Sequence, residues 1–216
     1  MASQRFHDRT EAGQRLAEAL APLAGAPDLL VLALPRGGVT VGAEVARRLG
    51  APLDVILVRK LGVPGHEELA MGAIASGGVR ILSEDVIDAL GISDRDIAAV
   101  AAAEEDELER RERAYRGARS PLAVEDRTVI LVDDGLATGS TMRAAAAALR
   151  SQHPRRLIAA VPVAPAQTCE ALRGEVDEVV CTRTPEPFHS VGEWYENFEQ
   201  TSDEEVRRLL GATEGA

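Results

Sequence analysis

Lysine, aromatic residues and cysteine are all scarce in this chain of 216 residues. Of its 24 basic residues only Lys60 is a lysine, and there are six aromatic residues (three Phe, two Tyr and one Trp). The two cysteines, Cys169 and Cys181, are too few for a disulfide framework, and they lack the spacing and the companion histidines of a zinc site. We therefore expect a protein of the reducing cytoplasm that holds no structural zinc.

A basic surface and long apolar runs are absent as well. The net charge is -11, from 24 basic and 35 acidic side chains, which disfavours a protein that binds nucleic acid through its phosphates. The longest apolar stretches, at residues 29–34 and 157–166, are too short to span a membrane. Charged residues from Arg5 to Arg15 would interrupt the apolar core of a signal peptide. We expect neither nucleic acid nor a membrane among the partners.

Composition and periodicity predict one ordinary globular domain over residues 1–216, since 45% of the residues are hydrophobic and 27% are charged. Apolar runs predict strands at 29–34, 53–58, 79–82, 128–132, 157–163 and 178–182. Helical spacing predicts helices at 8–23, 41–49, 83–91, 93–115 and 140–150, and a last one capped by Thr201 or Ser202. Residues 60–78, rich in glycine and polar groups, hold only a Pro64-Gly65 turn. This alternation predicts an α/β fold whose parallel sheet is covered by helices on both faces.

Two adjacent acids, followed by a loop of small and hydroxyl residues, carry the clearest chemistry. A strand ends at Val132, Asp133 and Asp134 follow, and residues 135–141 lead into a helix. Backbone N–H groups, three hydroxyls and a helix start favour a phosphate in that loop, whereas the carboxylates suit a vicinal diol or a cation. A ribose 5-phosphate satisfies both halves. The alternative is a plain strand–turn–helix junction with an Asp N-cap, and a Walker A loop is excluded by its missing Gly-Lys-Ser/Thr ending.

This string resembles the phosphoribosyl-diphosphate (PRPP) binding motif of type I phosphoribosyltransferases, in particular the version of adenine phosphoribosyltransferases, which also have Ala-Thr-Gly in the loop. Arg36-Gly37 is similar to the family's diphosphate loop, and Arg59-Lys60 to the segment after its second strand. The similarity covers residues 28–165. It implies the family's Rossmann-like parallel sheet, with a helical insertion at about residues 83–119 and a C-terminal hood at about residues 183–216.

The resemblance also implies a reaction and a role for each matching residue. The family displaces diphosphate from carbon 1 of PRPP with a nitrogen nucleophile, usually a base, through a transition state like an oxocarbenium ion. Asp133 and Asp134 would hold the ribose 2- and 3-hydroxyls, and the 5-phosphate would lie against Ala137, Thr138, Gly139, Ser140 and Thr141. The diphosphate would be received by Arg36, Gly37, Gly38, Arg59 and Lys60, and the implied catalytic residues are Asp133, Asp134, Lys60 and Arg36. Mg²⁺ is the implied cofactor, held through PRPP, with Asp133 and Asp134 as candidate protein ligands.

The acceptor half of the site departs from the family's known substrate classes. Enzymes for 6-oxopurines carry an acid where this chain has Ala137, and adenine enzymes often carry a Glu near the position of Ala75. Glu67 or Glu68, from the same segment as Ala75, is a candidate replacement. The resemblance implies a nitrogenous small molecule as the acceptor, with a nucleobase as one candidate, but these residues match no substrate class of the family.

Four of the six aromatic residues cluster near the C-terminus: Phe188, Trp194, Tyr195 and Phe198. In the family a C-terminal hood often stacks on the acceptor base, so Phe188 and Trp194 are candidate acceptor contacts. The simpler interpretation is that these rings anchor the tail to the core.

Two functions from different classes stay open. The first is a phosphoribosyltransferase that uses PRPP and Mg²⁺; the second is a non-catalytic regulatory protein that binds PRPP or a nucleotide. The missing acceptor acid and the highly charged helix at 93–115 motivate the second, although a solvated helix face is the simplest interpretation of those charges. A phosphotransfer receiver domain would place paired acids early in the chain, which disfavours that third interpretation. The resemblance to type I phosphoribosyltransferases also implies a homodimer.

Overall fold

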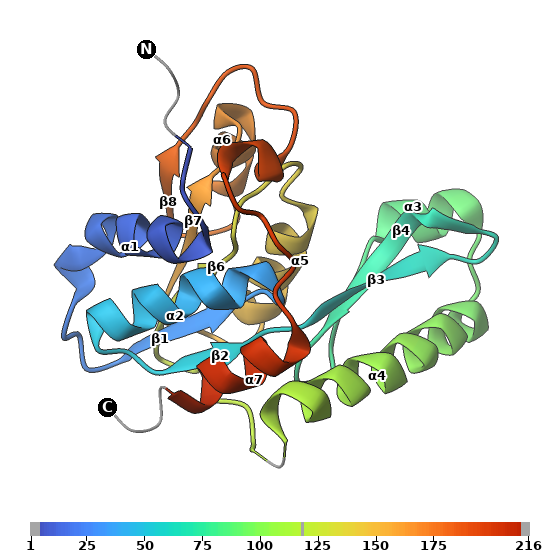
Figure 1. The fold of residues 1–216 in the computed structure, drawn as a ribbon. Coiled ribbons are helices and arrows are strands. Elements are labelled where there is room, and N and C mark those ends of the chain that lie inside the picture. The colour runs from blue at the N-terminus through green and yellow to red at the C-terminus, as the bar shows by residue number, and fades with distance from the viewer. Residues whose placement is uncertain (1–4, 118, 213–216) are drawn as a thin grey trace.

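The computed structural model describes residues 5–117 and 119–212, and at its centre lies a five-stranded parallel sheet (Figure 1). The strand order is β2-β1-β6-β7-β8, with bounds Leu53–Val55, Leu29–Ala33, Thr128–Val132, Arg156–Val163 and Glu178–Arg183. Strand β6 pairs with β1 from Leu29↔Thr128 to Ala33↔Val132, so both strands end at the same edge. The predicted fold class, a parallel sheet with helices on both faces, is confirmed.

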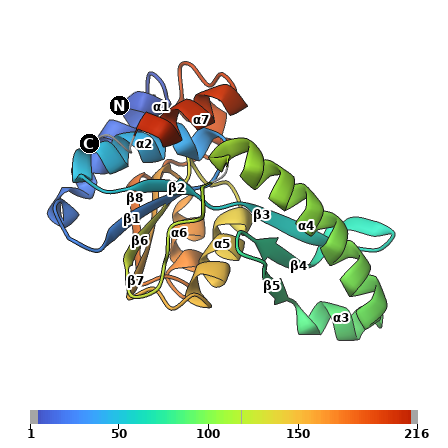
Figure 2. The same ribbon diagram turned by 90° about the horizontal axis from the view of Figure 1, so that it is seen from below.

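Both faces of this sheet are buried, which explains why its strands are almost continuously apolar. Alternate residues of β1 and β6, such as Val31 and Ile130, face α2 (Gly37–Leu49), and the same cluster includes residues of α1 (Arg9–Ala19) and of α7 (Asp203–Ala212), which packs against α2. Their neighbours, such as Leu30 and Val129, pack on the other face against α5 (Ser140–Arg150) and α6 (Ala166–Leu172), as Figure 2 shows. In the described parts of the chain, none of the helices has the length and hydrophobicity that a membrane crossing requires.

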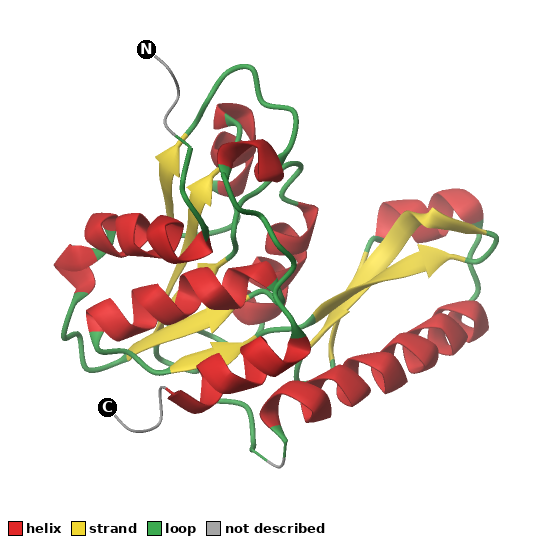
Figure 3. Ribbon diagram, in the orientation of Figure 1, coloured by secondary structure: helices red, strands yellow, loops and turns green. Residues whose placement is uncertain are grey.

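A second, antiparallel sheet projects from this core. It consists of β3 (Val58–Val63), β4 (His66–Ala75) and β5 (Val79–Leu82), and it carries α3 (Glu84–Leu90) and the long α4 (Asp94–Arg116) (Figures 1 and 3). Helix α4 contacts β3 and β4, while α5 of the core contacts all three strands. The projection therefore stands beside the carboxyl edge of the parallel sheet rather than forming a separate body.

The sequence prediction was wrong for this segment. The expected strand at 53–58 is divided, because β2 ends at Val55 and Val58 already begins β3 of the other sheet. Residues 60–78, expected without regular structure, form most of the β3–β4 hairpin around the predicted Pro64-Gly65 turn. The glycines of this segment indicated a loop, but they allow close packing of the strands. A Cβ at Gly72 would overlap the Ile81 carbonyl of the neighbouring strand.

The base of the projection is tied to the core by a buried ion pair. Arg116, at the end of α4, donates from Nε to Asp54 Oδ1 of β2 at 2.8 Å, and their side chains are only 4% and 8% exposed. The same guanidinium donates to Glu112 at 3.0 Å and to the Val55 carbonyl, while the backbone N–H of Leu122 donates to Asp54 Oδ2 at 3.1 Å. Every charged atom of the pair therefore has a partner.

Arg116→Leu should lower the free energy of unfolding by about 3–5 kcal/mol, because it leaves the Asp54 carboxylate buried without its counter-charge. Urea denaturation measures this. The matched control is Arg113→Leu on the same helix, whose side chain is 72% exposed and whose ion pair with Glu109 should contribute less than about 1 kcal/mol. Equal stability of the two variants would contradict this account of how the projection is attached.

Candidate functional site

Asp133 and Asp134 lie at the carboxyl edge of the parallel sheet, directly after β6. The backbone N–H of Asp134 donates to Asp133 Oδ1 at 2.8 Å, which fixes the first carboxylate. The first turn of α2 packs against both residues: a Cβ at Gly38 would lie 3.0 Å from Asp133 Cα, and one at Gly37 would overlap Asp134 Oδ2. A side chain at either position would require the acids or their backbone to shift, so the glycine pair allows the close approach of α2 to the acids.

The environment of the acid pair disfavours its ionisation. Burial, and then the adjacent charge of Asp134, raise the pKa of Asp133 well above its ordinary value. Burial also raises the pKa of Asp134, while the positive charge of Arg9 opposes that shift. Arg9 Nε lies 2.7 Å from Asp134 Oδ2, and the two side chains are only 11% and 15% exposed.

Arg9 was missed by the sequence analysis. It lies in the first turn of α1, outside the range of the family resemblance, and 125 positions separate it from Asp134. No local pattern marks it, because nothing in the sequence around residue 9 indicates where α1 packs on the sheet.

The loop after the acids is hydrogen-bonded to the core, and several of its residues are exposed to solvent. Leu136 N–H donates to the Val163 carbonyl at 3.0 Å, and Thr168 Oγ1 of α6 donates to the Ala137 carbonyl at 2.8 Å. Gly139 has a left-handed φ of 72°, and α5 begins at Ser140. Ala137, Thr138 and Thr141 remain exposed. The loop therefore presents hydroxyls and the N-terminus of an 11-residue helix to solvent, which is a favourable arrangement for an anion.

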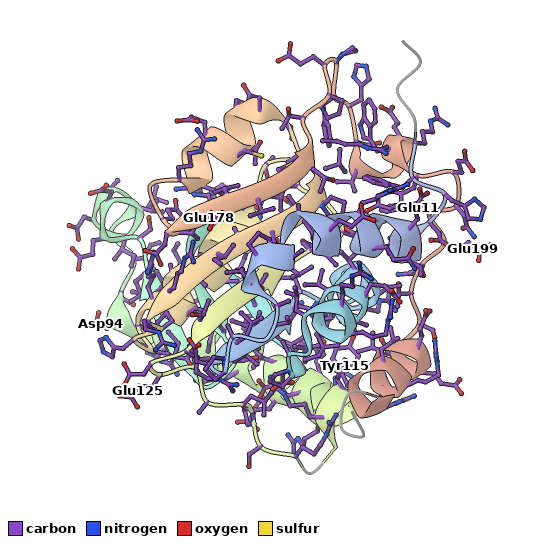
Figure 4. All side chains as sticks on the ribbon, turned by 90° about the vertical axis from the view of Figure 1, so that its left-hand side faces the viewer. Glu11, Asp94, Tyr115, Glu125, Glu178 and Glu199 are labelled. Carbon is purple, nitrogen blue, oxygen red and sulfur yellow. The ribbon has the colours of Figure 1, made fainter. Side chains whose placement is uncertain are left out.

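Arg36 stands where β1 gives way to α2, and the Pro35–Arg36 peptide bond is cis. Helix α2 begins at Gly37, four residues before the predicted start, so the glycine pair is helical and not part of an extended loop. Arg36 Nη1 lies 3.6 Å from Asp203 Oδ1 of α7. The same carboxylate accepts from the Tyr115 hydroxyl at 3.0 Å, and Figure 4 shows Tyr115 beside α7.

Arg59 and Lys60, adjacent on β3, face different elements. Arg59 Nε lies 2.5 Å from Glu104 Oε2 of α4. Lys60 is exposed and, with Ser140, lines a groove of about 680 Å³ between α5 and the second sheet. The structure therefore brings Lys60, but not the guanidinium of Arg59, to the same groove as the first residue of α5.

The candidate acceptor residues lie in two different places. Glu67 and Glu68 are exposed on β4, next to the hairpin turn at the outer end of the projection (Figure 1). The rings of Phe188 and Trp194 stack on each other, with centroids 6.4 Å apart. Both pack with Val191, which lies against Gly135 of the loop after the acids. The structure thus brings the aromatic tail, and not Glu67 or Glu68, close to that loop.

Tyr195 joins the tail to the acid pair. Its hydroxyl donates to the Asp134 carbonyl, its ring lies 5.6 Å from that of the buried Phe6, and burial raises its pKa. Phe6 and Tyr195 also form a parallel β-bridge. Among the described residues, the indole N–H of Trp194 is the one buried side-chain polar group without a hydrogen-bond partner, and no cluster of three or more His, Cys, Asp or Glu is placed to hold a metal.

Comparison with known proteins identifies the family of this chain. The phosphoribosyl transferase domain family matches residues 6–197. A provisionally named phosphoribosyl transferase of Mycobacterium tuberculosis, found in two strains, is 46% identical over 205 residues, which cover 95% of this chain. The aligned part is 46% of that relative's length, so the chain spans less than half of the curated relatives it matches.

A solved structure shares the fold of this chain. The crystal structure of TT1426 from Thermus thermophilus is 45% identical, covers 95% of this chain and 97% of its own, and superposes with a TM-score of 0.85. With nine-tenths of its length matched by the family and relatives at this level of identity, the chain belongs to the phosphoribosyl transferase domain family.

Proposed function

We propose that the protein transfers the 5-phosphoribosyl group from PRPP to a nitrogenous acceptor and releases diphosphate, which makes it a pentosyltransferase. One observation carries the proposal: a single connection, from β6 to α5, presents two carboxylates and then an open helix N-terminus within residues 133–141. The diol of a sugar phosphate matches the two carboxylates, and its phosphate matches the helix N-terminus that follows them.

The acids would act twice in the reaction. Asp133 and Asp134 accept hydrogen bonds from the ribose 2- and 3-hydroxyls, and their negative charge stabilises the positive ring that forms as the bond from carbon 1 to diphosphate breaks. The 5-phosphate would accept hydrogen bonds from the N–H groups and hydroxyls of residues 137–141. With both ends of the sugar held, carbon 1 is fixed for attack by the acceptor nitrogen.

Departure of the diphosphate requires positive charge on the other side of carbon 1. Arg36 and the N–H groups of Gly37 and Gly38 would bind the diphosphate, and Lys60 would approach it from the second sheet. Lys60 is better placed for this role than Arg59, because Glu104 already engages the Arg59 guanidinium. Arg36 would exchange its contact with Asp203 for the diphosphate.

The carboxylate oxygens of Asp133 and Asp134 are the donor type that Mg²⁺ prefers, and phosphate oxygens of the substrate would complete the coordination. The residues present therefore fit the ion. When bound, Mg²⁺ would supply charge neutralisation of the leaving diphosphate. We also propose a homodimer as the working form, on the basis of the family resemblance, and a cytoplasmic location, on the basis of the scarcity of cysteine.

The acceptor would enter beneath the aromatic tail. Phe188 and Trp194 stack on each other, which supports an anchoring role, and the buried indole N–H of Trp194 would become a donor to a polar acceptor only if the tail moves. We do not include Glu67 and Glu68 in the site, because they lie at the exposed end of the hairpin.

A second candidate function is a non-catalytic protein that senses PRPP or a nucleotide. The exposed Ala137 favours it, because that position offers no acid to deprotonate an acceptor. Diphosphate release from PRPP and Mg²⁺ with a panel of nucleobases and amines separates the two functions. Steady release with any acceptor eliminates the sensor, PRPP binding without release supports it, and absence of PRPP binding contradicts both the transferase and a sensor of PRPP.

Asp133→Asn and Asp134→Asn should each weaken PRPP binding by about 1.5–3 kcal/mol, roughly 10- to 150-fold, because each removes a charged acceptor of a ribose hydroxyl. Isothermal titration calorimetry with Mg²⁺ measures the change. Asp88→Asn, on the exposed face of α3, is the matched control and should bind as the unmodified protein does. Unchanged affinity in both site variants would remove the acids from the PRPP site.

Asp203→Asn should tighten PRPP binding, up to about fivefold, because it frees the Arg36 guanidinium from an exposed ion pair of modest strength. Tyr115→Phe is the control, since it removes the other partner of Asp203 and leaves the Arg36 contact in place. Weaker binding by Asp203→Asn than by Tyr115→Phe, measured in the same titrations, would show that Arg36 does not exchange partners.

A further inference from the structure

The N-terminal segment of the described chain meets the segment before α7 beside the acid pair. Residues 6–9 and 194–199, which we call the terminal clasp, are joined by backbone hydrogen bonds from Phe6 N–H to the Trp194 carbonyl and from Glu196 N–H to the Phe6 carbonyl, both at 2.8 Å. Asn197 N–H donates to the His7 carbonyl at 2.9 Å. Figure 4 shows Glu11 of α1 and Glu199 of the tail along the same edge of the molecule.

Arg9 is the charged member of the terminal clasp, and three contacts hold its guanidinium in place. Nε donates to Asp134 Oδ2 at 2.7 Å, Nη1 donates to the Glu199 carbonyl at 2.6 Å, and the guanidinium carbon lies 4.0 Å from the centre of the Phe198 ring. A side chain held from three sides and only 11% exposed has little freedom to leave when a ligand arrives.

The clasp holds Asp134 at two points. Arg9 takes one carboxylate oxygen, Oδ2, and the Tyr195 hydroxyl donates to the main-chain carbonyl of the same residue. Neither contact uses the second carboxylate oxygen, Oδ1. The first turn of α2 closes on the same pair, since a Cβ at Gly37 would lie 2.7 Å from Arg9 Nε.

We propose that Arg9 is a positioning residue for PRPP binding: it anchors one oxygen of Asp134 so that the carboxylate is fixed and charged toward the ribose diol. This inference rests on the proposed function. It makes α1 and the C-terminal tail part of the substrate site, beyond the PRPP motif and the two cationic segments found in the sequence.

A double-mutant cycle on PRPP binding tests this role, because a positioning residue acts only through the group it positions. Four proteins are titrated with PRPP and Mg²⁺ by calorimetry: the unmodified chain, Arg9→Gln, Asp134→Asn and the double variant. We expect Arg9→Gln to weaken binding about tenfold in the unmodified background and less than about twofold when residue 134 is already Asn. Arg9→Lys, which keeps the charge and one donor, should recover part of the loss.

Each contrary result has a separate meaning. Equal losses from Arg9→Gln in both backgrounds, or no loss at all, would overturn the positioning role while leaving the PRPP site intact. Absence of PRPP binding by the unmodified chain would instead overturn the proposed function. Arg15→Gln, on the same helix with a side chain 55% exposed, controls for damage to α1 and should bind as the unmodified chain does.

If Arg9→Gln does not fold, Tyr195→Phe provides the same test from the other contact, because it removes only the hydroxyl that holds the Asp134 carbonyl. We expect weaker PRPP binding from this variant as well. Unchanged affinity in Tyr195→Phe would contradict the claim that the terminal clasp positions Asp134.

Discussion

Burying two neighbouring carboxylates at the end of a strand costs free energy, and several neighbouring groups in this structure offset that cost. Burial raises the pKa of both Asp133 and Asp134, and the charge of Asp134 raises that of Asp133 further, so the fold must supply counter-charge and hydrogen bonds if the pair is to act as an anionic surface. It does so with the Arg9 guanidinium, with a backbone N–H to Asp133, and with a glycine pair that lets α2 approach. A chain that buried these acids for stability alone would be expected to replace them with apolar residues.

The arginines at and near the site are also paired with acids. Arg9, Arg36 and Arg59 each contact an acid of another element, namely Asp134, Asp203 and Glu104. Their strengths differ, because the Arg9 pair is close and buried whereas the Arg36 pair is longer and more exposed. Arg9 therefore suits a fixed support and Arg36 suits a group that changes partners, which is the division of roles that the proposed diphosphate site would need.

The sequence predicted those parts of the molecule whose cause is local. The β6–loop–α5 unit follows from an apolar run, two acids and a glycine-containing loop within fourteen positions, and the parallel sheet follows from the repetition of such runs. The features that the sequence did not predict depend on packing between segments that are far apart in the chain. The β3–β4 hairpin was missed because Gly62 and Gly72 resemble loop residues until the partner strand is known, and the start of α2 was misplaced because Gly37 and Gly38 disfavour a helix by propensity alone. Arg9 could not be found from its surroundings in the sequence, since its partner lies 125 positions away.

The central claim is that one connection, residues 133–141, receives both the diol and the phosphate of a single ribose. A crystal structure of the full chain with PRPP and Mg²⁺ tests it most directly. The account predicts density with the ribose hydroxyls on Asp133 and Asp134 and the 5-phosphate against the N-terminus of α5. Density for PRPP elsewhere on the molecule, with the loop at residues 135–141 empty, would contradict it.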